Sequence, residues 1–390
     1  MSIDAITAII FILLLALFLW KKRRNVELQR MLFPILYVVM YRSKFGIAKM
    51  DSWAKSFPRF LKWLGYAGVV LGFLGMIVIS FELVKNSFDV FLKPEAAPGI
   101  QPVLPFEAKG VFFVPFLYWI ISIFLLAVVH EFAHGVIARV HNVHVKSSGF
   151  AFLCFFLPVI PAAFVEPEET ILQKRRYREQ LSVFAAGPIS NLLFALLMLL
   201  LFTALSPAIT AAFEPKGVEI ASINETGPAG IAGLVKGDII TMFGEQKIES
   251  MQNVSAFLAT VSPGTNVMIQ ALNKSVMVTL GQNPTNASLA FLGIKAKPYI
   301  EKRPEFVSKY GGWLADLIKW FAGLLFWLFT LNIGIGLFNL LPIGPLDGGR
   351  MFQLALLKVF RKETAQKVLV FVSFLFVALI ISNMLFGFFR

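Results

Sequence analysis

Long apolar runs alternate along this chain with short polar or basic connections. Apolar runs cover Ile3–Trp20, Leu64–Phe81, Val111–Val129, Leu181–Leu205 and Val368–Phe386, and another begins near Trp313. An α-helix needs about 20 mostly apolar residues to cross the hydrocarbon core of a bilayer. The pattern therefore predicts a polytopic α-helical membrane protein with about six transmembrane helices.

Basic clusters follow or precede several of these runs and predict which ends face the cytoplasm. They lie at residues 21–24 (KKRR), 174–178 and 358–362. Cytoplasmic loops of membrane proteins carry an excess of Lys and Arg. A signal peptide has its positive charge before the apolar region, whereas here Asp4 comes first and the charge follows. We therefore expect a retained anchor in residues 1–24, with its N-terminus outside.

Residues 25–62 are mixed in character. Met31–Tyr41 is apolar but short and contains Pro34, so we do not expect it to span the membrane alone. Basic residues interspersed with aromatic ones surround it, at Arg42, Lys44, Lys49, Lys55, Arg59 and Lys62. The segment suits a cytoplasmic membrane surface, and a solvated basic loop is an equal alternative.

A second apolar stretch, within Lys146–Thr170, differs from the spans because it contains Pro158, Pro161 and Pro167. These prolines argue against one straight helix. Irregular backbone occurs at membrane depth only where it is buried in protein or lines a cavity. We therefore expect a re-entrant, β-like loop or hairpin after the third span.

Polar residues become frequent after Ser206. Alternating segments predict strands at Val218–Ile223, Asp238–Phe243, Asn266–Ala271 and Ser275–Leu280. Short helices fit Ala229–Leu234 and Met251–Val261, the latter with Ser250 as N-cap. These segments predict a small α+β domain inserted between spans, and the distribution of basic residues places it outside. Glycosylation sequons at Asn224, Asn253, Asn273 and Asn286 agree with this side, although chance also explains them.

We thus expect five regions: an anchor in 1–24, a surface segment in 25–62, a first membrane part in 63–205, the inserted domain in 206–300 and a second membrane part in 301–390. Composition agrees, since 57% of the residues are hydrophobic and soluble domains have about 45–50%. The net charge of +13 lies largely beside spans, and no nucleic-acid-binding motif accompanies it, which favours the lipid bilayer as partner. The single Cys154 excludes an intrachain disulfide.

The candidate chemistry begins directly after the third apolar run, with His130, Glu131 and His134. On a helix, His130 and His134 are four residues apart and project from one face, where they can bind one Zn²⁺. Glu131 lies beside them and can act as general base. The alternative is two interior histidines bonded to neighbouring helices. Ionisable residues at membrane depth cost about 2.5–3.5 kcal/mol on insertion scales, which favours a functional role.

A catalytic zinc usually has three protein ligands, so the motif needs one more. The position at which metzincins place a third His holds Val140. His141 and His144 are near in sequence, but Asp347 is the better candidate because it is a carboxylate expected at membrane depth after a Pro- and Gly-rich break. Asp347 could instead cap a helix or pair with Arg350.

Asn339 precedes Asp347 on the same apolar segment. A buried amide there can donate a hydrogen bond to a developing oxyanion. Bonding to the backbone of a neighbouring helix is an equal alternative.

Three motifs together resemble the site-2 protease family of intramembrane metalloproteases: HEFAH at 130–134, GPISN at 187–191 and NLLPIGPLDGG at 339–349. The insert, with GPAGIAGLVKGDII at 227–240, is similar to the PDZ domains found between the halves of many members. The order of elements also matches. The resemblance covers the chain from roughly residue 35 to the end.

The resemblance implies that one zinc ion is bound by His130, His134 and Asp347. It makes Glu131 the general base and acid and Asn339 a group that polarises the scissile carbonyl. The implied activity is hydrolysis of peptide bonds within or near transmembrane segments of other membrane proteins, in regulated intramembrane proteolysis. A non-catalytic PDZ-bearing receptor or scaffold with a structural metal is the main alternative, and a metal transporter is another.

The resemblance also implies how substrates bind. The segment from Gly149 to Pro167 corresponds to a membrane-associated β-segment that presents the substrate as an added strand. Candidate substrate-binding residues are Gly149, Phe150, Phe152, Gly187 and Asn191. The PDZ-like domain would bind a peptide or substrate terminus outside, through residues 216–220 or 291–294, while the active site faces the cytoplasm.

Overall fold

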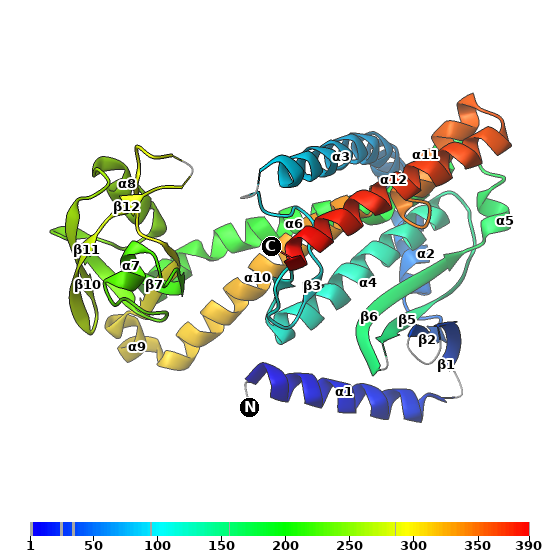
Figure 1. Cartoon of the computed structure of the whole chain (residues 1–390). Helices are drawn as coiled ribbons and strands as arrows, with labels where there is room; N and C mark the ends of the chain where they lie inside the picture. The colour runs from blue at the N-terminus through cyan, green and yellow to red at the C-terminus, as the bar shows by residue number, and fades with distance from the viewer. Residues whose placement is uncertain are drawn as a thin grey trace. The chain divides into compact units, whose positions relative to one another are not determined.

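The computed structural model describes residues 3–23, 26–32, 36–93, 96–155, 157–284 and 286–389. The chain forms two compact units (Figure 1). The first comprises residues 1–203 and 323–390, and the second comprises residues 204–322. The two units are described separately below.

Five helices among the described residues are long and apolar enough to cross a membrane. They are α3 (Pro58–Leu92), α4 (Phe116–Val140), α6 (Tyr177–Ala212), α10 (Gly312–Phe338) and α12 (Lys362–Phe389). The predicted class of polytopic helical membrane protein is confirmed. Helix α1 (Ile3–Lys21) is also apolar, but its described apolar part is shorter than the other five. The predicted count of six spans therefore stays a prediction.

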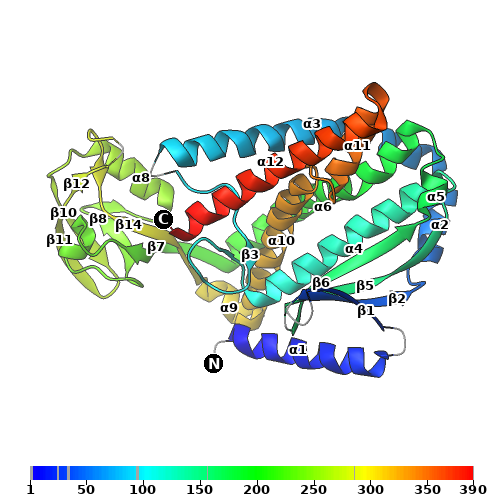
Figure 2. The ribbon, with the colours of Figure 1, turned by 45° about the vertical axis from the view of Figure 1, so that its right-hand side comes forward.

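Helix α4 is central in the first unit, where it contacts α1, α3 and the β-sheet (Figure 2). One cluster of buried side chains joins the first half of α4 to α10 through Trp119, Ile120 and Leu331. A second cluster joins its last turns to α2 (Ile47–Ser56), through Met50 and Val136. Both ends of α4 are thus fixed by buried apolar side chains.

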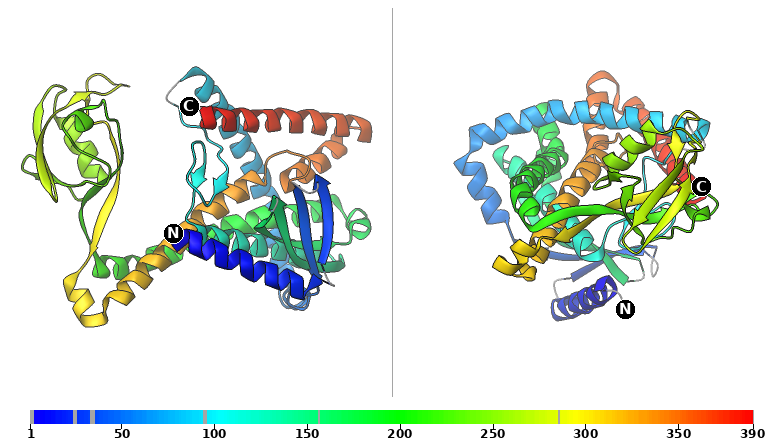
Figure 3. Two further views of the ribbon diagram at one scale, coloured as in Figure 1. Left: turned by 60° about the horizontal axis from the view of Figure 1, so that its bottom comes forward. Right: turned by 90° about the vertical axis from the view of Figure 1, so that its left-hand side faces the viewer.

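An antiparallel sheet of four strands covers one side of α4. The strands are β1 (Val26–Leu32), β2 (Leu36–Ser43), β5 (Val145–Phe155) and β6 (Leu157–Pro167), in the order β1-β2-β5-β6. Figure 3 shows them side by side. The hairpin predicted from the proline-containing stretch is confirmed as β5 and β6. Strand β6 is an edge strand and runs along α4.

One of the two predictions for residues 25–62 is wrong. Residues 26–32 and 36–43 form strands and not a solvated loop, and β2 pairs with β5 from Leu36↔Phe155 to Ser43↔Ser148. Val39 is buried in this sheet. The pattern did not reveal it because the partner strand lies far along the chain. The position of this segment at a membrane surface stays a prediction. Helix α3 then begins at Pro58, before the expected start of the span at Leu64.

Smaller elements modify two other predicted segments of the first unit. Residues before the third span form a short parallel pair, β3 (Val103–Leu104) and β4 (Phe112–Phe113), so α4 begins at Phe116 and not at Val111. The Pro- and Gly-rich segment after Phe338 is followed by a helix that was not predicted, α11 (Asp347–Val359). A short helix, α5 (Glu169–Leu172), follows β6.

The second unit is an α+β domain, as predicted. Its sheet has the order β11-β10-β8-β7-β14, with β9 paired to β8, and β12 pairs with β13 separately. The strands are β7 (Phe213–Ile223), β8 (Ile239–Phe243), β9 (Gln246–Lys247), β10 (Asn266–Ala271), β11 (Lys274–Thr279), β12 (Gly281–Gln282), β13 (Ala290–Phe291) and β14 (Ile294–Lys302). The helices are α7 (Pro228–Ile231), α8 (Met251–Thr260) and α9 (Pro304–Tyr310).

The sequence predicted most of this second unit correctly. All four predicted strands exist, and Ser250 caps α8 by accepting a hydrogen bond from the Asn253 N–H at 3.3 Å. Strand β14 was missed because its charged residues and Pro298 are untypical of a strand. It is nevertheless paired with β7 along its whole length. Helix α6 continues to Ala212, beyond the predicted end at Leu205.

Candidate active site

Three side chains from two helices converge beside the sheet. His130 and His134 project from α4, and their Nε2 atoms are 3.1 Å apart. Asp347, the first residue of α11, places Oδ2 at 3.0 Å from His130 Nε2 and 3.2 Å from His134 Nε2. Both histidines are buried, with 8% and 9% of their surface exposed. The predicted ligand set is therefore assembled in space.

The spacing of these atoms fits a metal ion. Within the described part of the chain, this is the one group of three or more His, Cys, Asp or Glu residues whose atoms could hold one. Ligands at about 2.0–2.1 Å around a tetrahedral zinc lie roughly 3.3 Å from one another. Three protein ligands leave a fourth position open, as in catalytic zinc sites. The donor set therefore suits a catalytic zinc.

Contacts on the far side of each imidazole orient the two histidines. His134 Nδ1 lies 2.7 Å from the carbonyl oxygen of Val183 on α6. Because a carbonyl only accepts hydrogen bonds, Nδ1 carries a proton, and the neutral imidazole then has its lone pair on Nε2, where it can bind a metal ion shared with His130 and Asp347. A backbone group thus sets the tautomer of His134.

Asn191 occupies the corresponding position behind His130. Its side-chain amide lies 3.1 Å from His130 Nδ1, and the residue is completely buried. As assigned, Nδ2 faces the ring and Oδ1 has no partner; with the amide turned about its axis, Oδ1 would accept a hydrogen bond from His130 Nδ1–H and leave Nε2 free to bind a metal ion. Asn191 was predicted to contact substrate; the structure places it, fully buried, behind His130, where its amide can orient the imidazole.

Gly187 explains how α6 can approach the two histidines so closely. A Cβ at this position would overlap His134 Nε2 and lie about 2.5 Å from His130 Nε2. Any larger residue would therefore displace the ligand atoms. The GPISN motif contributes a glycine that makes room for the ligands and an asparagine that orients one of them.

Glu131 lies on the same side of α4 as the edge strand. Its Oε2 accepts a hydrogen bond of 2.9 Å from the backbone N–H of Val165 on β6. Glu131, both histidines and Asp347 line a cavity of about 790 Å³, together with residues 162–167 of β6. The candidate base, the candidate metal ligands and residues of the edge strand thus share one cavity.

Asn339 also lines this cavity, on the segment between α10 and α11. Its carbonyl oxygen accepts a 2.8 Å hydrogen bond from the Gly348 N–H, which ties it to the residue after Asp347. The structure therefore places Asn339 where the sequence predicted, beside the candidate ligands.

The alternative ligands lie elsewhere. His141 Nε2 is 2.8 Å from Ser182 Oγ, and His144 is exposed beside Arg139. Arg350 approaches Glu169 at 3.9 Å and is not paired with Asp347. These placements favour Asp347 as the third ligand.

The expected substrate contacts on β5 are not matched by the structure. Gly149, Phe150 and Phe152 lie on a strand whose two edges are already paired with β2 and β6. Phe152 is buried among apolar side chains, and Phe150 packs on Phe124. None of the three lines the catalytic cavity. Residues of β6 line it instead, and only the order of strands in the sheet reveals this.

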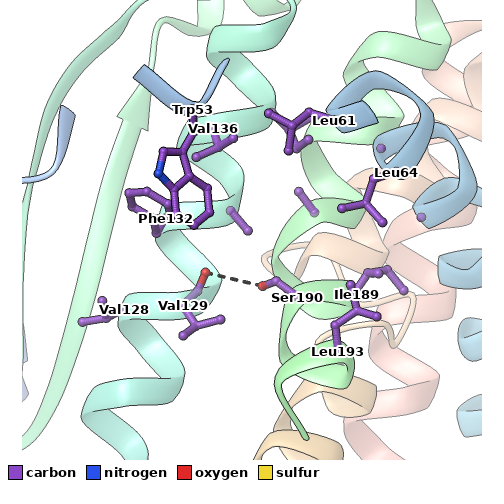
Figure 4. A pocket seen from close by; sticks show the side chains of 15 residues that line it. Trp53, Leu61, Leu64, Val128, Val129, Phe132, Val136, Ile189, Ser190 and Leu193 are labelled. Atoms are coloured by element: carbon purple, nitrogen blue, oxygen red, sulfur yellow. Dashed lines mark hydrogen bonds between the residues drawn. The ribbon is translucent and has the colours of Figure 1, made fainter. Parts of the chain in front are cut away.

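A second cavity, of about 340 Å³, lies on another face of α4 (Figure 4). Val129, Phe132 and Val136 line it, and helical periodicity places these three residues on a different face of α4 from His130 and His134. Ser190, its one hydroxyl, donates to the Val129 carbonyl oxygen at 3.4 Å. It therefore offers no group for hydrolysis, and the polar cavity is the candidate active site.

A buried His–His–Asp group with an adjacent glutamate, among helices that are apolar enough to span a membrane, is the arrangement expected of a membrane-bound metalloprotease. The model of peptidase family M50 matches residues 118–382 of the chain. The chain therefore belongs to this family, the site-2 protease family, and five of its described helices are long and apolar enough to span a membrane.

Similar proteins add little detail. An uncharacterized Methanocaldococcus jannaschii protein is 28% identical over 280 residues, which is 70% of this chain and 66% of that protein. The chain thus spans slightly less than two thirds of that relative. The PDZ domain of an SdrC-like protein from Listeria monocytogenes is 21% identical and aligns with 21% of this chain and 87% of its own, at a TM-score of 0.19.

Proposed function

We propose that this protein is a zinc endopeptidase that hydrolyses peptide bonds within or near transmembrane segments of other membrane proteins. The observation that carries the proposal is the shared cavity of His130, His134, Asp347 and Glu131 among apolar spanning helices. Regulated intramembrane proteolysis is the process that such an enzyme serves.

The residues divide the chemistry between them. His130, His134 and Asp347 would hold a zinc ion, which supplies Lewis-acid activation of water and of the scissile carbonyl. Glu131 takes the proton of the attacking water and delivers it to the leaving nitrogen. Asn339 donates to the carbonyl oxygen as negative charge develops there. The buried setting strengthens each of these interactions.

The substrate must be extended to react, because helical carbonyls are occupied by internal hydrogen bonds. Strand β6 supports this step through its unpaired edge. The Val165 N–H points at Glu131 and away from β5, so the N–H of Ala163, two residues earlier, also points outward. A substrate segment pairing with this edge would lie along the ligands.

The second unit has an edge strand along which the C-terminus of a substrate peptide could bind. Strand β14 is an edge strand, and α8 packs beside it. The preceding loop contains Gly293 in the left-handed region, at φ +81°. We propose that this unit is PDZ-like, lies outside, and binds a peptide C-terminus along β14, while the active site faces the cytoplasm. Competition between C-terminally free and amidated peptides for the full-length protein tests the carboxylate requirement.

Cleavage of a single-span reporter by wild type and by Glu131→Gln, with zinc content determined for both, tests the proposal. We expect cleavage by wild type only and equal zinc in both. Zinc without cleavage of a varied reporter set would favour the alternative of a PDZ-bearing receptor with a structural metal. Absence of zinc from wild type would contradict the metal site.

A further inference from the structure

Arg42 connects all four strands of the sheet in the first unit. From β2, its Nε donates to Glu27 Oε2 on β1 at 2.9 Å, and its Nη1 donates to Ser147 Oγ on β5 at 3.2 Å. The same Nη1 forms an ion pair with Glu166 on β6. Ser147 donates to Glu166 as well. One guanidinium therefore reaches the edge strand across β5.

Gly149 makes this reach possible. It lies opposite Arg42 in the sheet on one side and opposite Phe164 on the other, so the three positions share one face. A Cβ at Gly149 would overlap the Tyr41 carbonyl oxygen and lie 3.0 Å from the Phe164 ring. Because that space stays open, Arg42 Cζ lies 5.7 Å from the centre of the Phe164 ring. Gly149 thus leaves the room in which Arg42 approaches Phe164.

Glu166 is next to the residue that contacts the general base. Val165 donates its N–H to Glu131, and Glu166, one residue on, lines the catalytic cavity while pairing with Arg42. Two consecutive residues therefore tie β6 to the catalytic helix on one side and to the N-terminal strands on the other.

The ion pair is charged at neutral pH. Burial acts to raise the pKa of Glu166, but hydrogen bonds from Ser147 and Arg42 outweigh it and hold the pKa below its ordinary value. The side chains of Arg42 and Glu166 are 33% and 35% exposed. A partly exposed ion pair adds little to the free energy of folding. Its charge-assisted hydrogen bonds do fix the relative positions of the two side chains.

We propose that Arg42 is a positioning residue that fixes β6 against Glu131 and so determines which substrate bond is cleaved. The proposal rests on the proposed function. The family model matches residues 118–382, and strands β1 and β2 lie outside this range. The ion pair of Arg42 with Glu166 therefore depends on the N-terminal part of the chain. By pairing with β5, strand β2 also leaves β6 as the free edge on the catalytic side.

The first test compares Arg42→Ala, Arg42→Lys and Glu166→Gln by mass-spectrometric mapping of the bond cleaved in a reporter. We expect Arg42→Ala and Glu166→Gln to cleave neighbouring bonds as well, with kcat about 10- to 100-fold lower and zinc content unchanged. Arg42→Lys should partly restore the single position. The double variant Arg42→Ala/Glu166→Gln should be no worse than either single variant, because both remove one interaction.

The matched control is Asp51→Asn. Asp51 pairs with Arg139, at 29% and 24% side-chain exposure, and this ion pair joins α2 to α4. This variant should keep the single cleavage position. If Arg42→Ala and Glu166→Gln also keep it and only lower the unfolding temperature, Arg42 stabilises the fold and the proposal is wrong.

A second measurement does not depend on cleavage. Spin labels at Ala163 on β6 and Lys367 on α12, in a Cys154→Ala background, report the distance between the edge strand and the helices. We expect a broader distance distribution in Arg42→Ala than in wild type or Asp51→Asn. An unchanged distribution would overturn the proposal. A wild type that cleaves no reporter would contradict the proposed function alone.

Discussion

The backbone N–H of Val165 donates a 2.9 Å hydrogen bond to Glu131 Oε2, so the edge strand β6 is attached directly to the glutamate of the H-E-x-x-H motif. The same strand is fixed from its other side by the ion pair of Glu166 with Arg42. Two consecutive residues of β6 therefore contact the candidate base on one side and Arg42 on the other. The predictions below follow from this arrangement.

Ala163→Pro should weaken substrate binding. It removes an outward N–H from the free edge of β6, and proline is tolerated on an edge where the N–H is not used within the sheet. One lost hydrogen bond costs about 0.5–1.5 kcal/mol, which corresponds to a KM roughly 2- to 12-fold higher. Steady-state kinetics with the reporter measure it. Unchanged KM with normal zinc content would argue against strand addition at β6.

Gly187→Ala should impair zinc binding. The added Cβ overlaps the ligand nitrogens of both histidines, so α4 and α6 must separate or the imidazoles must turn. We expect zinc content after dialysis to fall well below one per chain and cleavage to be lost. Gly334→Ala on α10 is the control, because its Cβ would meet nothing within 4 Å. Equal zinc content in the two variants would refute the close approach at Gly187.

Asn191→Ala should lower zinc affinity by about 10- to 100-fold, because outer partners of metal-bound histidines contribute this much. Competition with a chromophoric chelator measures the change. Asn332→Ala is the control, since Asn332 is equally buried and its amide donates to the Leu328 carbonyl of its own helix. If both variants lose affinity equally, the effect reflects general destabilisation and not the contact with His130.

Removal of zinc should lower thermal stability. A ligand that binds only the folded state at 100 times its Kd adds about 2.7 kcal/mol. We expect a chelator to lower the Tm of wild type in detergent and of Glu131→Gln, which retains the three ligands. Asp347→Ala should unfold at the same temperature with and without chelator. A chelator-dependent Tm in Asp347→Ala would show that zinc binds elsewhere.

The sequence determined much of the chemistry and the membrane class. Spans can be located from local composition, because twenty apolar residues in succession suffice to cross a bilayer. His130, Glu131 and His134 come from one helix, so their relation follows from helical periodicity alone. Asp347 could also be predicted as a ligand from the sequence, since burying a carboxylate at membrane depth costs free energy unless it has a partner. The structure brings these ligands within 3.2 Å of one another.

Only the tertiary structure decided which strand faces the site. Residues 36–43 of β2 pair with β5 from far away in the sequence, and no local pattern encodes such pairing. That pairing makes β5 an inner strand, removes Gly149, Phe150 and Phe152 from the cavity, and leaves β6 as the edge. The place of Asn191 behind His130 likewise depends on how α4 and α6 pack. Composition and helical periodicity therefore predicted the ligands, whereas long-range pairing and packing set the surface presented to a substrate.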